Sequence, residues 1–178
     1  MIPYKQKLSH GCLAASLLIL ASERGLKIKD KDEETIVLNG MNRKYMFYIV
    51  GLPEEFIKKT KLKLNLFVDN KYFTNVLKKK FSNKKIKVMH HKINLELIEE
   101  LLLKSPIIIH MDNNTLGDYS HSSHFIVLTK SLKEYFMIID PLKGKLSKIS
   151  KEKIINSIKL LKEHIKMCPL IFQLGDSR

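Results

Sequence analysis

Apolar positions follow a helical spacing in the first part of the chain. The blocks 12–24 ("CLAASLLILASER") and 95–104 ("LELIEELLLK") have apolar residues three and four apart, which predicts helices, with Asn94 as the cap of the second. Further helices are expected to begin at Pro53, a good first-turn residue, and near Asn70. Between these helices, we expect short strands near Met46–Val50 and at "IKVMH", and a charged turn at "KIKDKDEE".

From Pro106 onward the pattern changes to short runs rich in β-branched and aromatic residues, which predict strands. These runs are "PIIIHM", "HFIVLTK", "EYFMIID" and "CPLIFQL", interrupted by one amphipathic helix that follows Ser150 as its cap. Helices followed by strands indicate an α+β fold. We expect one domain over 1–178, with a helical lobe at about 1–104, an antiparallel β lobe at about 105–178 and a cleft between them.

Composition restricts the class of protein and its partners. The 178 residues are 44% hydrophobic, enough for one folded domain with a real core. The net charge of +14 comes almost entirely from lysine, with three arginines, whereas reading of bases favours arginine. Specific nucleic-acid binding is therefore disfavoured, which leaves AT-rich codon usage or an acidic partner as explanations. Two cysteines give no disulfide framework, so a reducing, cytoplasmic setting is expected.

Cys12 stands between a polar run, "YKQKLSHG", and the apolar block that follows it. Three interpretations compete: the core of a signal peptide, an ordinary buried thiol, or a nucleophile. The signal-peptide interpretation is weakened because the block runs into Glu23 and Arg24, and no stretch is long enough to span a membrane. A lone cysteine on an apolar helix is usually a small core residue. In the first turn of a helix, however, the dipole favours a thiolate.

The runs "HFIVLTK" and "EYFMIID" are separated by three residues and predict a β-hairpin. A hairpin symmetric about Leu132 places His124 directly opposite Asp140. The carboxylate would then hold the imidazole at Nδ1–H and leave Nε2 for chemistry. A slip of one residue would put the two side chains on opposite faces of the sheet. The alternative is that Asp140 simply opens the turn "DPLKG".

Gln6 six positions before Cys12, then "SHFIVL" and "IIDPLKG", resemble the papain-like bacteriocin-processing (double-glycine leader) peptidases over most of the chain. The resemblance implies a papain-like fold of two lobes, with Cys12 as nucleophile, His124 as general base and acid and Asp140 as the orienting residue. It also implies that Gln6 donates its amide to the oxyanion hole, together with the Cys12 backbone N–H. The chain departs from the family in having Leu13, not glycine, after the cysteine.

Other histidines and the second cysteine carry weaker signals. His90, His91 and His110 do not form a metal-ligand pattern with clustered cysteines or acids, so we expect no metal and no cofactor. His121 is a competing base, but it lies out of register with Asp140. Cys168 begins a strand before a proline and is expected to be structural.

The main hypothesis is a cysteine peptidase acting on a peptide or protein substrate through Cys12, His124, Asp140 and Gln6. A papain-like acyltransferase and a non-catalytic peptide-binding module are the alternatives. Substrate sequence, oligomeric state and the need for a partner are not determined by the sequence.

Overall fold

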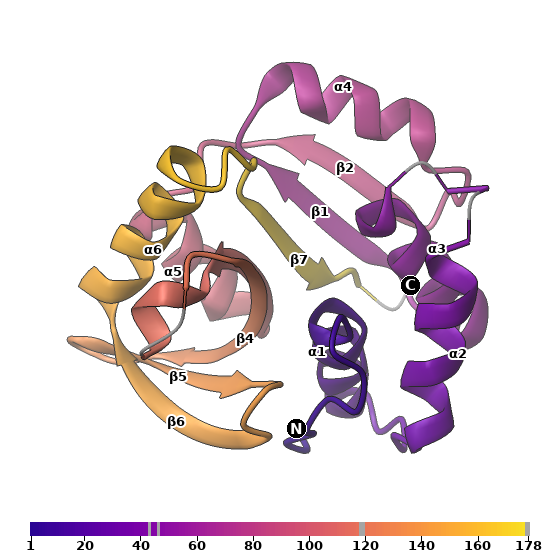
Figure 1. Cartoon of the computed structure of the whole chain (residues 1–178), viewed down its shortest axis with the longest axis horizontal. Coiled ribbons are helices and arrows are strands. Elements are labelled where there is room, and N and C mark those ends of the chain that lie inside the picture. Colours follow the sequence, from indigo (N-terminus) through magenta and orange to yellow (C-terminus); the bar gives the residue numbers. More distant parts are fainter. Residues whose placement is uncertain (43, 46, 118–119, 177–178) are drawn as a thin grey trace.

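Strands from both halves of the chain form one sheet in the computed structural model, which describes residues 1–42, 44–45, 47–117 and 120–176. Within those ranges the order of the strands is β2-β1-β7-β3-β4-β5-β6, and only β1 and β2 are parallel (Figure 1). The strands are β1 (Leu64–Val68), β2 (Ile86–His90), β3 (Ile107–Asp112), β4 (Ser123–Ser131), β5 (Tyr135–Asp140), β6 (Lys145–Ser150) and β7 (Leu170–Leu174).

The helices cover both faces of this sheet. They are α1 (Cys12–Glu23), α2 (Asp30–Gly40), α3 (Tyr48–Thr60), α4 (Lys71–Lys80), α5 (Leu95–Lys104) and α6 (Lys151–Glu163), with a short 3-10 helix at Asn113–Leu116. Asn70, Asn94 and Ser150 each accept a hydrogen bond from the backbone of the first turn that follows, so the predicted caps of α5 and α6 are confirmed. None of the helices in the described ranges is long and apolar enough to cross a membrane.

Two hydrophobic cores lie on opposite faces of the sheet. In one core, the four helices α1, α2, α3 and α4 pack on one side of the sheet. In the other core, α5 and α6 pack on the opposite side. The odd-numbered residues Phe125 and Val127 of β4 belong to the first core, and their neighbours Ile126 and Leu128 belong to the second. This alternation is the period of two expected for a strand that is covered on both faces.

The predicted α+β class is confirmed, but the sheet is not confined to the second half of the sequence. β7, from the C-terminal end, pairs with β1 on one side and with β3 on the other. β1 and β2 therefore extend the sheet beneath the helices of the N-terminal half. α1 lies between the two ends of the curved sheet and packs on β4 (Figure 1).

Two local predictions are wrong. The segment predicted as a strand near Met46–Val50 is the first turn of α3 from Tyr48 onward, while Met46 lies outside the described residues. α3 thus begins well before Pro53, which stands inside the helix. Ile49, Val50 and Leu52 at the start of the helix are all buried, and this packing outweighs the single backbone hydrogen bond that a proline removes.

The predicted charged turn at "KIKDKDEE" is also wrong, because α2 begins at Asp30. The Lys29 N–H donates to the carboxylate of Asp32 at 2.9 Å, which closes the first turn of this helix. Three acidic residues in that turn suit the positive end of the helix dipole. One of them, Glu33, is completely buried.

Candidate active site

Cys12 is the first residue of α1, at the end of the helix that faces the cleft. The following residues, Leu13 to Ser22, are all buried, whereas Cys12 is half-buried and its thiol is free. The unpaired N–H groups and the dipole of a helix start favour negative charge at this place. The sequence therefore anchors the thiol through a buried helix and leaves it open to the cleft.

His124 and Asp140 are in hydrogen-bond contact at the open end of the β4–β5 hairpin. His124 Nε2 lies 2.9 Å from Asp140 Oδ1, and the two residues are only 3% and 2% exposed. The Leu142 N–H donates to the same carboxylate oxygen at 2.9 Å, and Asp140 Oδ2 is buried without a hydrogen-bond partner. This network fixes the orientation of the imidazole ring.

The register of the hairpin differs from the predicted one. β4 shifts by one residue between Leu128 and Lys130, so that Val127 pairs with Ile139. Continuing this register places Asp140 opposite Ile126, diagonal to His124 and on the same face of the sheet. The predicted direct opposition is therefore wrong, although the two side chains still meet because diagonal neighbours are within reach of long side chains.

The diagonal offset also reverses the predicted roles of the ring nitrogens. Nε2, at the far end of the imidazole, spans the diagonal to Asp140, so Nδ1 is the nitrogen that does not contact the carboxylate. The prediction had Nδ1 on the carboxylate and Nε2 free. A carboxylate directly opposite the histidine would favour that arrangement, whereas a carboxylate one step further along the strand favours the observed one.

The surroundings of His124 favour its charged form. Burial alone lowers the pKa of a histidine, but the hydrogen bond with Asp140 and the interaction with Cys12 outweigh burial and raise the pKa of His124 to about 9. Burial by itself would raise the pKa of Asp140. The contact with His124 and the hydrogen bond from the Leu142 N–H lower this pKa by more than burial raises it, so the pKa of Asp140 is below its usual value. These contacts favour an imidazolium at His124, between the carboxylate of Asp140 and the side chain of Cys12.

Gln6 lies in the wall of the same cleft. Its backbone N–H donates to the carbonyl of Pro141 at 2.8 Å, which ties the N-terminal segment to the turn after Asp140. Its side-chain nitrogen donates to the Leu8 carbonyl at 2.8 Å and, at 3.4 Å, to the Ser9 carbonyl, and its Oε1 is buried without a partner. The Gln6 amide is therefore held by its own loop, and its role toward an oxyanion stays a prediction.

The cleft around these residues has a volume of about 480 Å³. The polar or chemically active residues that line it are Gln6, Ser9, His10, Cys12, Tyr48, Asn113, Ser122, Ser123 and His124. Asn113 is 7% exposed and its Oδ1 has no hydrogen-bond partner, so it is a further polar group available at this cleft. The four residues that the sequence singled out meet here, since Gln6, Cys12 and His124 line the cleft and Asp140 contacts His124.

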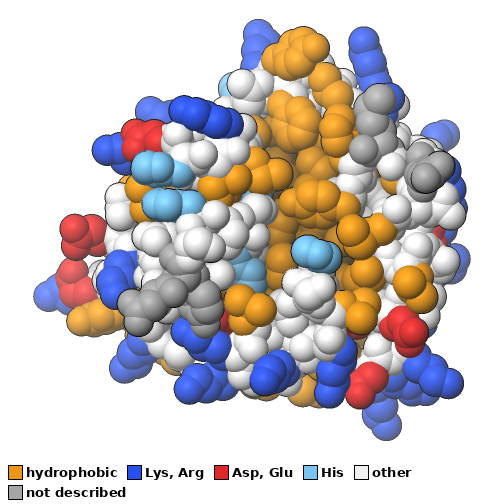
Figure 2. Space-filling model, viewed as in Figure 1, with side chains coloured by type: hydrophobic (Ala, Val, Ile, Leu, Met, Phe, Trp, Pro, Cys, Tyr) orange, Lys and Arg blue, Asp and Glu red, His pale blue; other side chains and the backbone are white. Residues whose placement is uncertain are grey.

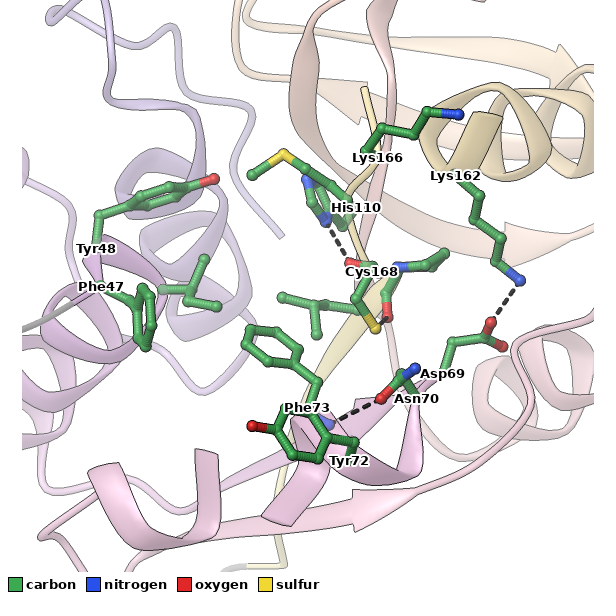
Figure 3. A pocket seen from close by; sticks show the side chains of 14 residues that line it. Phe47, Tyr48, Asp69, Asn70, Tyr72, Phe73, His110, Lys162, Lys166 and Cys168 are labelled. Carbon is green, nitrogen blue, oxygen red and sulfur yellow. Dashed lines mark hydrogen bonds and ion pairs between the residues drawn. The ribbon is translucent and has the colours of Figure 1, made fainter. Parts of the chain in front are cut away.

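A second cavity, of about 640 Å³, lies next to the cleft and is more apolar. Tyr48 and Met167 line both spaces, and the aromatic rings of Phe47, Tyr48 and Phe73 point into the second cavity (Figure 3). On the surface, hydrophobic side chains form a hollowed strip down the middle of this face, with histidines along its borders (Figure 2). The cavity could receive apolar side chains of a bound chain.

The other candidate histidines and the second cysteine are occupied elsewhere. His121 Nδ1 lies 2.6 Å from Asp112 Oδ2, so it does not compete for Asp140. Burial lowers the pKa of His110 to about 4, and this neutral ring contacts Ser123 Oγ at 2.7 Å. Burial raises the pKa of the Cys168 thiol to about 11. In the described ranges, no three His, Cys, Asp or Glu side chains gather as metal ligands.

Sequence reasoning missed Glu33, Tyr48 and Asn113. Glu33 lies in a run of charged residues, which is typical of an exposed segment. Only the spacing of Ile36 and Val37 after it indicates a helix with a buried face. Asn113 follows the end of β3, where a polar residue after an apolar run is a common sign of a site. Tyr48 carries no signal in the sequence, because the pattern of its segment predicts a strand and the residue begins α3.

Comparison with solved structures shows which known proteins share this fold. No family model matches the chain, and no curated protein matches its sequence. A solved structure of a C39-like peptidase from Bacillus anthracis matches with a TM-score of 0.60 at 15% identity, over 99% of this chain and 96% of that one. The peptidase domain of Streptococcus ComA, a bifunctional ABC transporter of a quorum-sensing pathway, matches with a TM-score of 0.54 at 14% identity, covering 98% and 97%.

A third solved structure is a double-glycine-motif protease from an AMS/PCAT transporter in complex with the leader peptide. It matches with a TM-score of 0.50 at 21% identity, over 98% of this chain and 93% of that chain. The chain therefore has the papain-like fold of C39-like peptidase domains over nearly its whole length. The predicted resemblance is confirmed at the level of the fold, and the chemistry has to be argued from the site itself.

Proposed function

We propose that this protein is a cysteine peptidase in which Cys12 is the nucleophile, His124 the proton carrier and Asp140 its orienting partner. The observation that carries the proposal is the meeting of a half-buried thiol at a helix start with a histidine bound to a buried carboxylate in one cleft. A thiol, an imidazole and a group that orients the imidazole are the parts that thiol hydrolysis requires.

In the proposed reaction, the Cys12 thiolate attacks the carbonyl carbon of a peptide bond. The electron pair moves to the carbonyl oxygen, and donors that include the Gln6 amide stabilise this oxyanion. As the tetrahedral intermediate collapses, His124 gives its proton to the leaving amine and a thioester remains on Cys12. His124 then takes a proton from water, which attacks the thioester and releases the carboxylic acid and the thiolate.

The substrate class follows from the space beside the nucleophile. The apolar cavity continues from the cleft past Tyr48, so a peptide with apolar side chains on one side of the cut bond fits both spaces. One structural neighbour holds a leader peptide, which supports a peptide substrate for this chain as well. Because both thiols are free and the nucleophile must stay reduced, we place the reaction in a reducing compartment such as the cytosol.

The test is the incubation of the protein with a mixed peptide library and identification of new termini by mass spectrometry. Cleavage is expected with wild type and with Cys168→Ala, and it should be lost in Cys12→Ala. Addition of a small primary amine distinguishes the acyltransferase, because that class gives an amide product instead of a free acid. Peptides that are retained intact by wild type would favour the peptide-binding module and contradict the proposal.

A further inference from the structure

Glu33 is a buried carboxylate that the proposed reaction does not use. It lies in the first turn of α2 and has no exposed surface. Its two oxygens accept hydrogen bonds from the Tyr4 hydroxyl at 2.8 Å, from the Lys7 N–H at 2.9 and 3.2 Å, and from the Leu8 N–H at 3.1 Å. All of these donors belong to the segment that leads to Cys12.

The same carboxylate also touches the far end of that segment. A Cβ atom at Gly11 would lie only 2.0 Å from Glu33 Oε1, so a side chain cannot replace this glycine without displacing the carboxylate. Gly11 donates its backbone N–H to the Leu8 carbonyl at 3.0 Å, which closes the loop immediately before Cys12. Glu33 thus fits inside the loop formed by residues 4–11.

A buried carboxylate is costly unless its oxygens are hydrogen-bonded, and charge-assisted bonds are stronger than neutral ones. In the described part of the chain, no cation pairs with Glu33, so the loop itself supplies its stabilisation. Burial and the Glu33 contact raise the pKa of Tyr4, which keeps the phenol a donor. Loop closure and burial of the carboxylate therefore depend on each other.

Gln6 lies between the two ends of this arrangement. The neighbouring residues Tyr4, Lys7 and Leu8 bind Glu33 on one side, and the Gln6 N–H binds the Pro141 carbonyl on the other. The backbone of Gln6 is held between α2 and the turn that follows Asp140, and the residue lines the Cys12 cleft from this fixed base.

We propose that Glu33 is a positioning residue for the oxyanion site, which acts by holding the 4–11 loop so that the Gln6 amide stays in the cleft. The inference rests on the proposed function, and it assigns to α2 a role in the reaction although α2 supplies no catalytic group. It also explains why glycine stands directly before the cysteine.

The test is a double-mutant cycle on peptide cleavage with Glu33→Gln and Gln6→Ala. Glu33→Gln keeps the shape but presents an amide to backbone N–H groups, so kcat should fall roughly 10–100-fold with KM within about twofold. Gln6→Ala should lower kcat by roughly 10²–10³. If Glu33 acts through Gln6, the double variant should be no slower than Gln6→Ala alone, within about threefold.

Two further variants separate this role from loss of the fold. Glu34→Gln removes the same charge from an exposed neighbour on α2 and should keep the wild-type kcat. Tyr4→Phe removes only one of the hydrogen bonds to Glu33, so its kcat should fall between those of wild type and Glu33→Gln. Labelling of Cys12 by iodoacetamide passes through no oxyanion. The rate of this labelling should therefore be the same in all variants.

Losses that multiply in the double variant, or an equal fall in labelling and cleavage, would overturn the positioning role. Unchanged kcat in Glu33→Gln would do the same. These results differ from failure of the proposed function, which would appear as a lack of cleavage by the wild-type protein before any variant is made.

Discussion

At the scale of single residues, the proposed reaction assigns to Asp140 the control of His124. The carboxylate fixes Nε2 and favours the imidazolium, while Nδ1 remains for the thiol. This pair also links the site to stability. Because the pKa of His124 is raised to about 9 from 6.5, its contribution is complete below about pH 6.5 and is lost as the pH rises through about 9. The lowered pKa of Asp140 makes its contribution complete above its usual range and lost in acid.

Asp140→Asn should therefore change both the rate and its pH dependence. Turnover should fall, by up to about 10⁴ if the pair behaves as in serine triads. The alkaline limb of kcat/KM, which we expect near the His124 pKa of about 9, should move to lower pH because the group that raises this pKa is gone. Measurement of kcat/KM between pH 5 and 10, with circular dichroism as a control for folding, checks both effects. A wild-type rate and an unmoved limb would remove Asp140 from the mechanism.

At the scale of elements, a one-residue bulge separates two registers in the β4–β5 hairpin. The pairs next to the loop, such as Ser131 with Phe136, follow a register that would put His124 and Asp140 on opposite faces of the sheet. The shift around Thr129 corrects this register by one residue, so that the pairs beyond it bring the two side chains to one face.

Deletion of Thr129 should consequently be tolerated. Without the extra residue, Lys130 and Ser131 continue the register of Val127 with Ile139, and every residue of β4 keeps its face. We expect cleavage within about threefold of wild type and a fall in stability of about 1 kcal/mol from the altered loop and the lost Thr129 hydrogen bond. Kinetics and urea unfolding provide the measurement. A total loss of activity in a folded deletion variant would show that the bulge itself shapes the site.

The hairpin illustrates what could be predicted from the sequence. The alternation of β4 and β5 and the short loop predict the hairpin and the nearness of His124 to Asp140, since these depend on local patterns. The register could not be predicted, because it depends on where the loop ends and on the bulge at Thr129, and no local pattern in β4 marks either one. The nitrogen that faces Asp140 follows from that register and was missed with it.

Tertiary contacts explain the other failures in the same way. Glu33 carries the composition of an exposed turn, and only its contacts with residues 4–11 make it a buried group. α3 begins before Pro53 because its first turn is packed into the core. Local helix propensity carries no information about this packing. In contrast, the caps Asn94 and Ser150 act on their own first turns and could be predicted from the sequence.

At the scale of the whole molecule, the site lies where the N-terminal helix meets the curved sheet. The Ser16 hydroxyl donates to the Phe125 carbonyl at 3.3 Å, so α1 is tied to β4 one turn beyond Cys12 and one residue beyond His124. Cys12 and His124 therefore come from elements that are far apart in sequence and directly packed in space. Their separation is set by the core, not by a loop.

The net charge of +14 is also a property of the whole molecule and should affect the encounter with substrate. A peptide with Asp or Glu flanking the cut site should have a higher kcat/KM than its neutral counterpart at low ionic strength. The difference should disappear at about 1 M salt, where the Debye length is near 3 Å. Stopped assays of both peptides over a salt series measure this. Equal values at all salt concentrations would assign the lysines to codon usage instead of to substrate attraction.

Cys12 is the proposed nucleophile, and Cys168 provides an internal control for its reactivity. At about pH 6, a brief pulse of iodoacetamide should modify Cys12 far faster than a free thiol, whose pKa is about 8.5. Cys168, whose pKa is raised to about 11 by burial, should stay unmodified until the protein is unfolded.

Mass spectrometry of the digested protein reads both cysteines in one experiment. In His124→Ala, labelling of Cys12 should slow because the imidazolium that stabilises its thiolate is absent, and Cys168 should not change. We expect fast labelling of Cys12 that depends on His124. Equally slow labelling of the two cysteines, or selective labelling of Cys168, would contradict it.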